Sequence, residues 1–364
     1  MKLLDTLSGA TIVITCGPGG IGKTTSAAAL ASAMAVSSNR RVLVVTVDPA
    51  RRLADALGIP GIGNEPVRVP TTSGELSVAM LDPQASWDAL IRRQAPDGAT
   101  AERILRNVLY QNITRRFVQS HDYIAMERLY ELVQRDEWDL IVVDTPPTRN
   151  ALDFLDAPSR MADFFSSRFL KWLIAPSRAS VTTLAARPLM YIADRILGAA
   201  FLADITEFFL LLNSMYDGFV ERARQVSDVL RRDSTRFVVV STSERIPVTE
   251  ASFFDEELRR RDLRVAGWLV NRLLPPSLRG AEVEREVREL RAQQFDDVAT
   301  ARVRDLLCNV TEEWHRRALD EMAVVATLAS GPTPVFGAET AEGQIDTFEG
   351  VVQLGQQILT AESF

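Results

Sequence analysis

A glycine-rich segment near the start of the chain is the strongest constraint on its fold. Residues 17–24 read Gly-Pro-Gly-Gly-Ile-Gly-Lys-Thr and follow the apolar run 11–15 directly. A helical pattern then runs from residue 23 to about residue 36. A strand, this loop and a helix, in that order, are the context in which such a loop binds phosphates. The segment therefore predicts a site for a nucleoside triphosphate, although it does not select adenine over guanine.

The loop has two physical means of holding a phosphate chain. Its glycines let backbone N–H groups turn toward the phosphates, and the helix N-terminus adds partial positive charge. Lys23 is expected to reach the β- and γ-phosphates, and the Thr24 hydroxyl to ligate Mg²⁺. The alternative, a glycine-rich turn without chemistry, is disfavoured by the flanking strand and helix. The nucleotide-binding residues predicted from this loop are Gly17, Gly19, Gly20, Ile21, Gly22, Lys23 and Thr24.

Short β-branched runs recur along the chain and end in loop residues. Most show little alternation of polar and apolar residues, as expected for strands covered by helices on both faces of a parallel sheet. Helical segments separate them, which indicates repeated βαβ units. We therefore predict an α/β protein with a doubly wound, mostly parallel sheet and ligands at the carboxyl ends of its strands. The predicted strands are 11–15, 42–47, 76–80, 140–143, 237–240 and 265–270.

Three long stretches carry helical rather than strand patterns. They lie at about residues 84–135, 156–232 and 277–328. No long low-complexity linker separates them from the strands. We therefore predict a single domain over residues 1–364 with an inserted helical subdomain, rather than separate tethered domains.

Two aspartates follow predicted strands. Asp144 ends the run 140–143, where a carboxylate beside the phosphate loop can hold Mg²⁺, often through water. Asp48 ends the run 42–47, and a second carboxylate there could orient the attacking water. An aspartate after a strand is more often a turn or cap residue, so neither position is decisive by itself.

Composition excludes several classes of protein. A net charge of −7 and arginine clusters placed among acidic residues leave no basic footprint for nucleic acid. Only two cysteines occur, Cys16 and Cys308, too few for a disulfide framework or a zinc site. The start of the chain lacks the pattern of a signal peptide, and charges interrupt the most apolar stretch, about 196–212. We therefore expect a cytoplasmic protein without stable membrane insertion.

Several segments, taken in order, resemble one family of ATPases. Residues 48–55 resemble its D-P-A-x-x-L-x-D segment, and residues 144–158 resemble its D-T-x-P-T switch with the L-x-F-L and proline that follow. Residues 81–83 are similar to its I-D-P, residues 270–273 to its V-N-x-L, and residues 334–343 to its C-terminal adenine loop. The family includes the arsenical-pump ATPase and the tail-anchored-protein targeting ATPase. The blocks keep family order from about residue 10 to residue 355.

The resemblance implies roles for the phosphate and metal residues. Lys23, Thr24 and Thr25 would bind phosphate and Mg²⁺ in a Mg²⁺-dependent ATPase. Asp48 would lie in the first switch and polarise the attacking water, so that Lys23 and Asp48 are the predicted catalytic residues. Asp144 would support Mg²⁺ from the second switch, which makes Thr24 and Asp144 the predicted metal residues.

The resemblance also implies a base site and a dimer. Asn271 would read the edge of adenine, and the loop at Pro334 would pack on the base. Members of the family form dimers that close when ATP binds and open after hydrolysis. We therefore expect ATP and Mg²⁺ as cofactors, and either a homodimer or a heterodimer with a paralogous ATPase.

Two departures from the family pattern bear on function. Pro18 stands where the family has a lysine that reaches the partner's phosphates, so charge stabilisation across the dimer is in question. Arg51, Arg52 or Arg149 could replace that lysine, or a paralogous partner could supply it; otherwise Pro18 only shapes the loop and hydrolysis is slow. The family's zinc-binding C-x-x-C and the metalloid-binding cysteines are also missing, which disfavours an arsenite or anion pump.

The output of the ATPase is the least determined part. The stretch 164–219 is apolar enough to form a groove for a hydrophobic client helix, as in the tail-anchored-targeting branch, but an apolar face is more often packed core than groove. Our main hypothesis is an ATPase whose cycle handles a protein client. The alternative is a weakly active nucleotide-binding subunit of a heterodimer. A membrane-partitioning ATPase is disfavoured, because residues 350–364 lack a basic amphipathic stripe.

Overall fold

The computed structural model describes most of the chain, including all of the predicted strands. The described residues are 1–47, 52–59, 61–71, 73–111, 118–145, 216–295, 297–340 and 347–364, with Asp156, Arg160, Asp163, Phe208 and Leu210. Most of the predicted helical stretch 156–232, including the apolar run 196–212, lies outside them.

An eight-stranded sheet forms the centre of the molecule, in the order β3-β4-β2-β5-β1-β6-β7-β8. Only β3 runs antiparallel to its neighbour; every other pair is parallel. The predicted α/β class with a mostly parallel sheet is confirmed, and so are the six predicted strands. β3 and β8 were not predicted. The strands are β1 (Ile12–Cys16), β2 (Arg41–Thr46), β3 (Val67–Val69), β4 (Glu75–Met80), β5 (Leu140–Asp144), β6 (Thr235–Ser241), β7 (Val265–Leu273) and β8 (Val335–Glu339).

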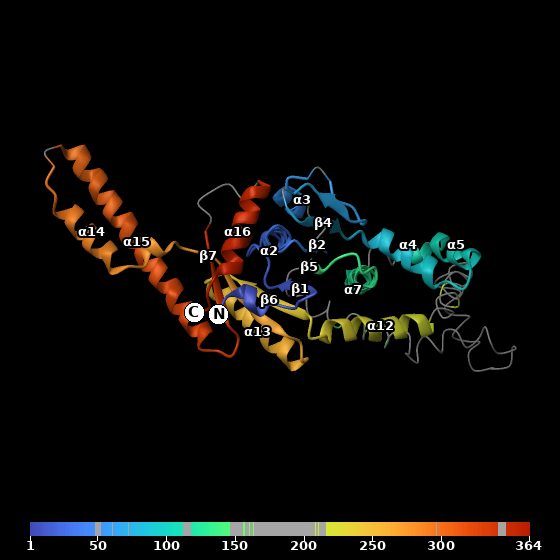
Figure 1. Ribbon diagram of the computed structural model, residues 1–364. Helices are drawn as coiled ribbons and strands as arrows, with labels where there is room; N and C mark the ends of the chain where they lie inside the picture. The colour runs from blue at the N-terminus through green and yellow to red at the C-terminus, as the bar shows by residue number, and fades with distance from the viewer. Residues whose placement is uncertain are drawn as a thin grey trace, which may run out of the picture.

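Helices cover both faces of the sheet (Figure 1). The described helices of the first half are α1 (Leu3–Thr6), α2 (Lys23–Ser38), α3 (Arg52–Leu57), α4 (Pro83–Gln94), α5 (Gly98–Arg106) and α7 (Val118–Gln134). Those of the second half are α12 (Tyr216–Arg231), α13 (Arg245–Arg260), α14 (Ala281–Ala292), α15 (Val298–Ala329) and α16 (Phe348–Thr360), with the short 3-10 helix Pro276–Leu278.

One face of the sheet is closed by small residues. α2 is rich in alanine and is buried on nearly every side, because it lies between the sheet and α16. Gly355 of α16 approaches the α2 backbone so closely that a Cβ there would lie 1.9 Å from the carbonyl oxygen of Ala29. The two helices can therefore meet at backbone distance, and the helix that begins at the glycine-rich loop is held firmly.

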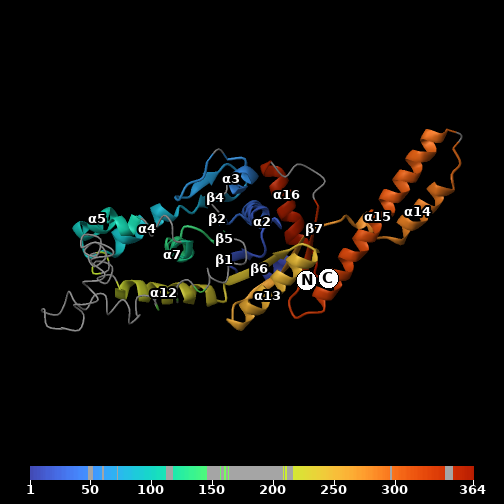
Figure 2. The ribbon, with the colours of Figure 1, turned by 180° about the vertical axis from the view of Figure 1, so that it is seen from behind.

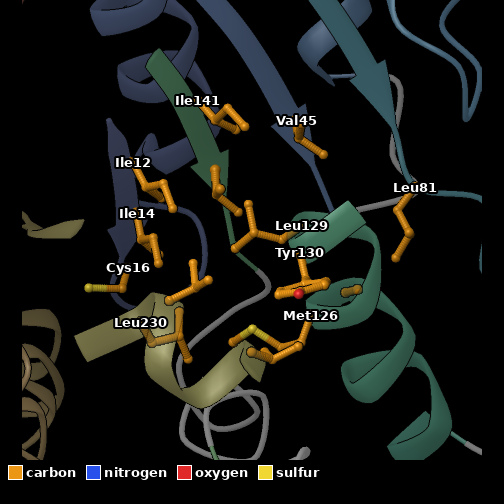
Figure 3. Packing of buried hydrophobic residues seen from close by; sticks show 14 of the residues in the cluster. Ile12, Ile14, Cys16, Val45, Leu81, Met126, Leu129, Tyr130, Ile141 and Leu230 are labelled. Carbon is orange, nitrogen blue, oxygen red and sulfur yellow. The ribbon is translucent and has the colours of Figure 1, made fainter. Parts of the chain in front are cut away.

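The other face is closed by larger side chains from α7, α12 and α13. Leu129, Tyr130 and Met126 of α7 pack with Leu230 of α12 against the strands (Figure 3). Cys16 is 1% exposed and belongs to this cluster, which agrees with the expectation that it is a core residue.

Buried charges also join the helices of this face. Glu127 is 0% exposed and accepts a hydrogen bond from Nε of Arg222 at 2.9 Å. Burial raises the pKa of Glu127, and Arg222 lowers it in part. Burial alone would also raise the pKa of Glu131, but hydrogen bonds from Arg93, Arg128 and Arg135 hold it at about 2. The folded protein therefore stabilises the ionised form of Glu131.

The helical regions extend beyond the sheet at opposite ends (Figure 2). α4, α5 and α12 extend from one end, and α14 and α15 project together from the other. The helices lie within the predicted helical stretches, while the division into a domain with insertions stays a prediction. Across the residues that the structure covers, no helix has both the length and the apolarity to cross a membrane.

Candidate nucleotide site

The glycine-rich loop joins the carboxyl end of β1 to the first turn of α2. Gly17 has φ +147°, and a Cβ at this position would lie 2.1 Å from the carbonyl oxygen of Val240 in β6. Gly22 has φ +92°, and a Cβ there would lie 2.4 Å from Nδ2 of Asn271 in β7. Glycine is therefore required at both ends of the loop, because the loop packs against the ends of two strands.

Lys23 turns back over this loop. Its side chain is 7% exposed, and Nζ donates a hydrogen bond to the carbonyl oxygen of Pro18 at 2.8 Å. Pro18 itself is buried within the chain. Thr24 and Thr25 follow in the first turn of α2 and are half-buried. The ammonium group thus lies over the loop that leads into the N-terminus of α2, where positive charge favours phosphate binding.

Asp144 is brought to the same edge of the sheet by β5. It pairs in register with Thr15 of β1 and with Thr46 of β2. The carboxylate is 0% exposed, and Oδ2 accepts a hydrogen bond from Oγ1 of Thr46 at 2.9 Å. Next to it, Oγ1 of Thr145 donates to the carbonyl oxygen of Thr15 at 2.8 Å. A buried carboxylate with a held orientation therefore lies at the end of β5, beside β1, the strand from which the loop emerges.

Asn271 contacts the loop itself. Its Nδ2 donates to the carbonyl oxygen of Ile21 at 2.9 Å, and its Oδ1 accepts from the backbone N–H of Arg272 at 3.0 Å. Arg272 has φ +61°, so the strand turns sharply after Asn271. The sequence places Asn271 near a nucleotide but does not indicate this bond. Its predicted reading of adenine stays a prediction.

A cavity of about 640 Å³ opens at the carboxyl ends of β6, β7 and β8. Thr242 and Arg272 line it from the sheet side, and Trp314 and Arg317 of α15 line the opposite wall. Thr242 is 6% exposed, and its Oγ1 has no hydrogen-bond partner among the described residues. The Arg317 guanidinium lies 5.2 Å from the Trp314 ring. Sequence reasoning missed this wall, because nothing in the local sequence shows which helix crosses these strand ends.

Pro334 is set apart from the other predicted site residues. It precedes β8, and its carbonyl oxygen accepts from the backbone N–H of Trp268 in the middle of β7 at 2.8 Å. Since β8 runs parallel to β1, its start lies at the sheet edge opposite the glycine-rich loop. The length of β8 therefore separates Pro334 from the glycine-rich loop, and its packing on a base stays a prediction.

The two cysteines do not form a joint site. Cys16 ends β1, and burial raises the pKa of its thiol, an effect that Lys23 opposes in part, so the thiol stays neutral. Cys308 is buried on α15, between that helix and α14.

Some predicted residues lie outside the described part of the chain. These are Asp48, Arg51, Arg149 and Gly343, together with the side chain of Arg52. Their predicted roles are therefore neither supported nor opposed by the geometry.

The site and the fold agree with what comparison of the whole chain shows. Residues 10–301 match the profile of the ArsA ATPases, which are described as anion-transporting ATPases. The chain belongs to this ATPase family. The match ends within α15, so it covers the glycine-rich loop, Asp144 and Asn271 but not β8. The resemblance found from the sequence segments is confirmed, and the chain is an ATPase by its family.

Relatives of this ATPase span a wide range of eukaryotes. ATPase GET3 of Malassezia globosa is 26% identical over 260 residues, which cover 71% of this chain and 72% of that protein. The ATPase ASNA1 homolog of Entamoeba dispar is 26% identical over 264 residues, covering 71% of this chain and 75% of the relative. ATPase GET3B of Arabidopsis thaliana is 25% identical over 279 residues, which cover 72% of this chain and 64% of that protein.

Proposed function

We propose that this ATPase hydrolyses ATP with Mg²⁺ at the loop of residues 17–24 and couples the cycle to opening and closing of a dimer. The observation that carries the proposal is the convergence of the loop amides, the buried ammonium of Lys23 and the buried carboxylate of Asp144 at one edge of the sheet. Together they match the electrostatic demands of a transferring phosphoryl group.

Lys23 is poised to exchange one partner for another. In the structure its Nζ is held by the carbonyl oxygen of Pro18. A triphosphate on the loop would offer the same ammonium a charged acceptor, which makes a stronger hydrogen bond than a neutral carbonyl. Rotation of the Lys23 side chain would bring its Nζ to the β- and γ-phosphates. α2 itself would not rearrange, because the sheet and α16 hold it in place.

The residues present fit a bound Mg²⁺. Thr24 offers a hydroxyl at the first turn of α2, and Asp144 offers a carboxylate whose other contact, to Thr46, orients it. Oxygen ligands of this kind, completed by waters and phosphate oxygens, are those Mg²⁺ prefers. When bound, the ion would neutralise charge that develops on the phosphate oxygens. Asp48 is proposed, from the family resemblance, to polarise the attacking water.

The cavity beside the loop is the proposed place of the base and ribose. It adjoins Arg272, the residue after Asn271, and so lies beside the loop on the side away from Asp144. Trp314 and Arg317 offer a planar aromatic and a guanidinium surface, on which a base can stack. The unpartnered Oγ1 of Thr242 offers a polar contact inside it.

A second candidate is a nucleotide-binding subunit with little activity alone. The observation that favours it is Pro18, which is buried and uncharged, and whose carbonyl oxygen is used by Lys23 of the same chain. Such a loop places no cation from residue 18 on a partner's phosphates. In this case a paralogous ATPase would supply the missing charge, and the pure chain would bind ATP but turn it over slowly.

The client is the broadest part of the proposal. We propose a protein client, with a hydrophobic or membrane-protein client as the specific case, handled by the stretch 164–219, which the sequence predicts to be helical. The support is the apolar composition of that region and the family resemblance. A cytoplasmic location stays a prediction from the sequence.

The decisive experiment measures Mg²⁺-ATP binding by calorimetry and hydrolysis by phosphate release. Lys23→Ala should lower turnover by about a thousandfold or more and weaken ATP binding, because the ammonium is lost from the phosphates. Lys2→Ala removes an exposed lysine of the same charge and should change neither. Normal turnover by Lys23→Ala would contradict the site.

Two further measurements separate the candidates. Asp48→Asn should leave ATP bound while stopping turnover, and an ATP-loaded Asp48→Asn chain should retain its client in an affinity purification. Robust hydrolysis by the pure chain would eliminate the weakly active subunit. Slow hydrolysis that rises on addition of a paralogous ATPase would support it instead.

A further inference from the structure

One carboxylate of α15 holds the backbone just beyond β7. The inner half of α15 lies beside the end of β7, and its outer half runs away from the body with α14 (Figure 1). On the inner half, Oε2 of the half-buried Glu321 accepts a hydrogen bond from the backbone N–H of Leu274 at 2.8 Å. One turn further along, Val325 is fully buried in the main core. The Glu321 carboxylate is therefore carried by a firmly packed part of the helix.

The end of β7 is irregular at the point that Glu321 supports. From Val270 to Leu273, β7 advances three positions, while β8 advances two, from Gly337 to Glu339, so β7 contains an extra residue. We call this irregularity the β7 bulge. Arg272 lies in it with φ +61°, a left-handed conformation that costs free energy for a residue with a side chain. The β7 bulge therefore depends on contacts with its surroundings.

The contacts on the far side of the β7 bulge come from three places. The carbonyl oxygen of Leu273 accepts from the backbone N–H of Thr340 at 2.8 Å, directly after β8. The carbonyl oxygen of Leu274 accepts from the guanidinium of Arg279, a few residues along the same connection. The N–H of Leu274 is held by Glu321. Glu321 is thus the contact that fixes this turn to α15.

The near side of the β7 bulge is Asn271, which contacts the glycine-rich loop. Its Nδ2 donates to the carbonyl oxygen of Ile21 at 2.9 Å. The same nitrogen lies 2.4 Å from where a Cβ of Gly22 would be, so the amide is packed directly on the residue before Lys23. Bulges beside functional sites commonly serve to aim a side chain in this way. A shift of the β7 bulge would therefore move Asn271 relative to the loop.

The charge of Glu321 distinguishes two roles that it could have. Glu321 lines the cavity at the strand ends together with Trp314 and Arg317. A carboxylate in this wall repels an anionic nucleotide, so its charge does not favour binding directly. The same charge does strengthen the hydrogen bond from the Leu274 N–H. Support of the backbone is therefore the role that the geometry favours.

We propose that Glu321 is a positioning residue of the nucleotide site. It fixes the β7 bulge, and the β7 bulge in turn holds Asn271 against the carbonyl oxygen of Ile21. Glu321 acts on the loop through these residues and does not have to contact the nucleotide. Its effect on ATP affinity rests on the proposed function, whereas its effect on the loop exists without nucleotide.

The first test measures Mg²⁺-ATP binding by the full-length chain with calorimetry. Glu321→Ala should weaken binding about threefold, because the β7 bulge loses one support, and in turnover the change should appear in KM rather than in kcat. Glu321→Gln should restore native affinity, since its amide oxygen still accepts from the Leu274 N–H. Glu313→Ala removes an exposed carboxylate of α15 about two turns away and is the matched control. Equal loss in Glu321→Gln and Glu321→Ala, or tighter binding in both, would overturn the proposal.

The second test asks whether Glu321 acts through Asn271. In a chain that already carries Asn271→Ala, the further change Glu321→Ala should have no additional effect, so the double variant should bind about fivefold more weakly than the native chain. Independent effects would multiply to about fifteenfold. A fifteenfold loss would show that Glu321 does not act through Asn271 and would exclude the positioning role.

The third test uses amide NMR of the full-length chain without nucleotide. Hydrogen exchange at the Leu274 N–H should accelerate in Glu321→Ala but not in Glu321→Gln. The amide resonance of Gly22 should shift in Glu321→Ala in the same direction as in Asn271→Ala. A Gly22 resonance that ignores Glu321→Ala would contradict the inference. Because no nucleotide is present, this result stands even if the native chain fails to bind Mg²⁺-ATP, which would refute the proposed function instead.

Discussion

The glycine-rich loop and the α14–α15 hairpin differ in how far the rest of the protein encloses them. The loop is enclosed by the ends of β6 and β7, so that Gly17 and Gly22 have no room for a Cβ. The hairpin has a small core of its own, centred on Val283, Val287 and Cys308, and leaves an apolar face in water. Enclosure keeps a phosphate site in one geometry, whereas exposure of this kind is a feature of surfaces that bind partners.

The contrast teaches where mutations should act globally and where locally. The loop is part of the continuous sheet core, so a change there should affect stability and nucleotide binding together. The hairpin joins the body mainly through the C-terminal half of α15, where Val325 enters the main core. A mutation in the outer hairpin should therefore change the local stability of the hairpin alone.

The largest effect is expected at Gly17. Gly17→Ala places a Cβ 2.1 Å from a backbone oxygen of β6 at φ +147°, so unfolding free energy should fall by about 4 kcal/mol. Mg²⁺-ATP binding should be lost as well. Gly20→Ala is the matched control: its φ is +80° but nothing lies within 4 Å of the new Cβ, so the cost should be about 1 kcal/mol. Denaturant unfolding and calorimetry measure both, and equal costs would mean that the loop is not enclosed.

Low pH should lower the stability of the body of the molecule more than the stability of the hairpin. The folded pKa of Glu131 is about 2, below its ordinary value of 4.5, so its contribution is complete above 4.5 and is lost as pH falls toward 2. That contribution is about 3 kcal/mol at most. Glu131→Gln should lower stability at neutral pH and remove this part of the acid dependence. Glu312→Gln breaks only the exposed pair with Arg291 in the hairpin and should cost less than about 1 kcal/mol at any pH.

Truncation inside the hairpin should stay local. Val287 is 5% exposed and packs on Cys308, so Val287→Ala should destabilise the hairpin by about 2 kcal/mol. Hydrogen exchange of α14 should accelerate while exchange in β1 and the affinity for Mg²⁺-ATP stay unchanged. Val298→Ala truncates a side chain that is 67% exposed and serves as the control. Faster exchange in β1 would show that the hairpin and the body unfold as one unit.

The smallest effect is expected at Asn271. Asn271→Ala removes the donor to the Ile21 carbonyl oxygen, which weakens support of the loop without adding strain. ATP affinity should fall about fivefold, the equivalent of about 1 kcal/mol. Asn271→Ser keeps a shorter polar group and tests whether the bond or the volume matters. If ATP affinity were unchanged in both variants, the Asn271 side chain would contribute nothing to the support of the loop.

The sequence predicts the enclosed region better than the exposed one. Six strands are recognisable because the sequences of buried parallel strands are continuous runs rich in β-branched residues. β3 has only three residues, and β8 contains Gly337 and follows Pro334, so neither resembles such a run. For the same reason the sequence indicates a loop at Pro334, whereas the structure places it directly before β8, at the amino ends of the parallel strands.

Within the site, motif spacing locates Lys23 and Asp144 but not their surroundings. The bond between Asn271 and Ile21 joins residues 250 positions apart and depends on strand order, which the local pattern does not contain. The cavity wall of Trp314 and Arg317 depends on where α15 crosses the sheet. The exposed apolar face of α15 does have a sequence signal, because α15 carries apolar residues on two of its sides, at Cys308 and at Leu307 for example, where a helix with a single partner needs only one.

The close contact between α2 and α16 has a consequence for biosynthesis. α2 starts at the glycine-rich loop, and the helix that covers its outer side is translated only after all eight strands of the sheet. While the ribosome is still working, the alanine surface of α2 has only the sheet to lie against. Capture of nucleotide by a growing chain should therefore lag behind formation of the central strands and begin only after translation of α16.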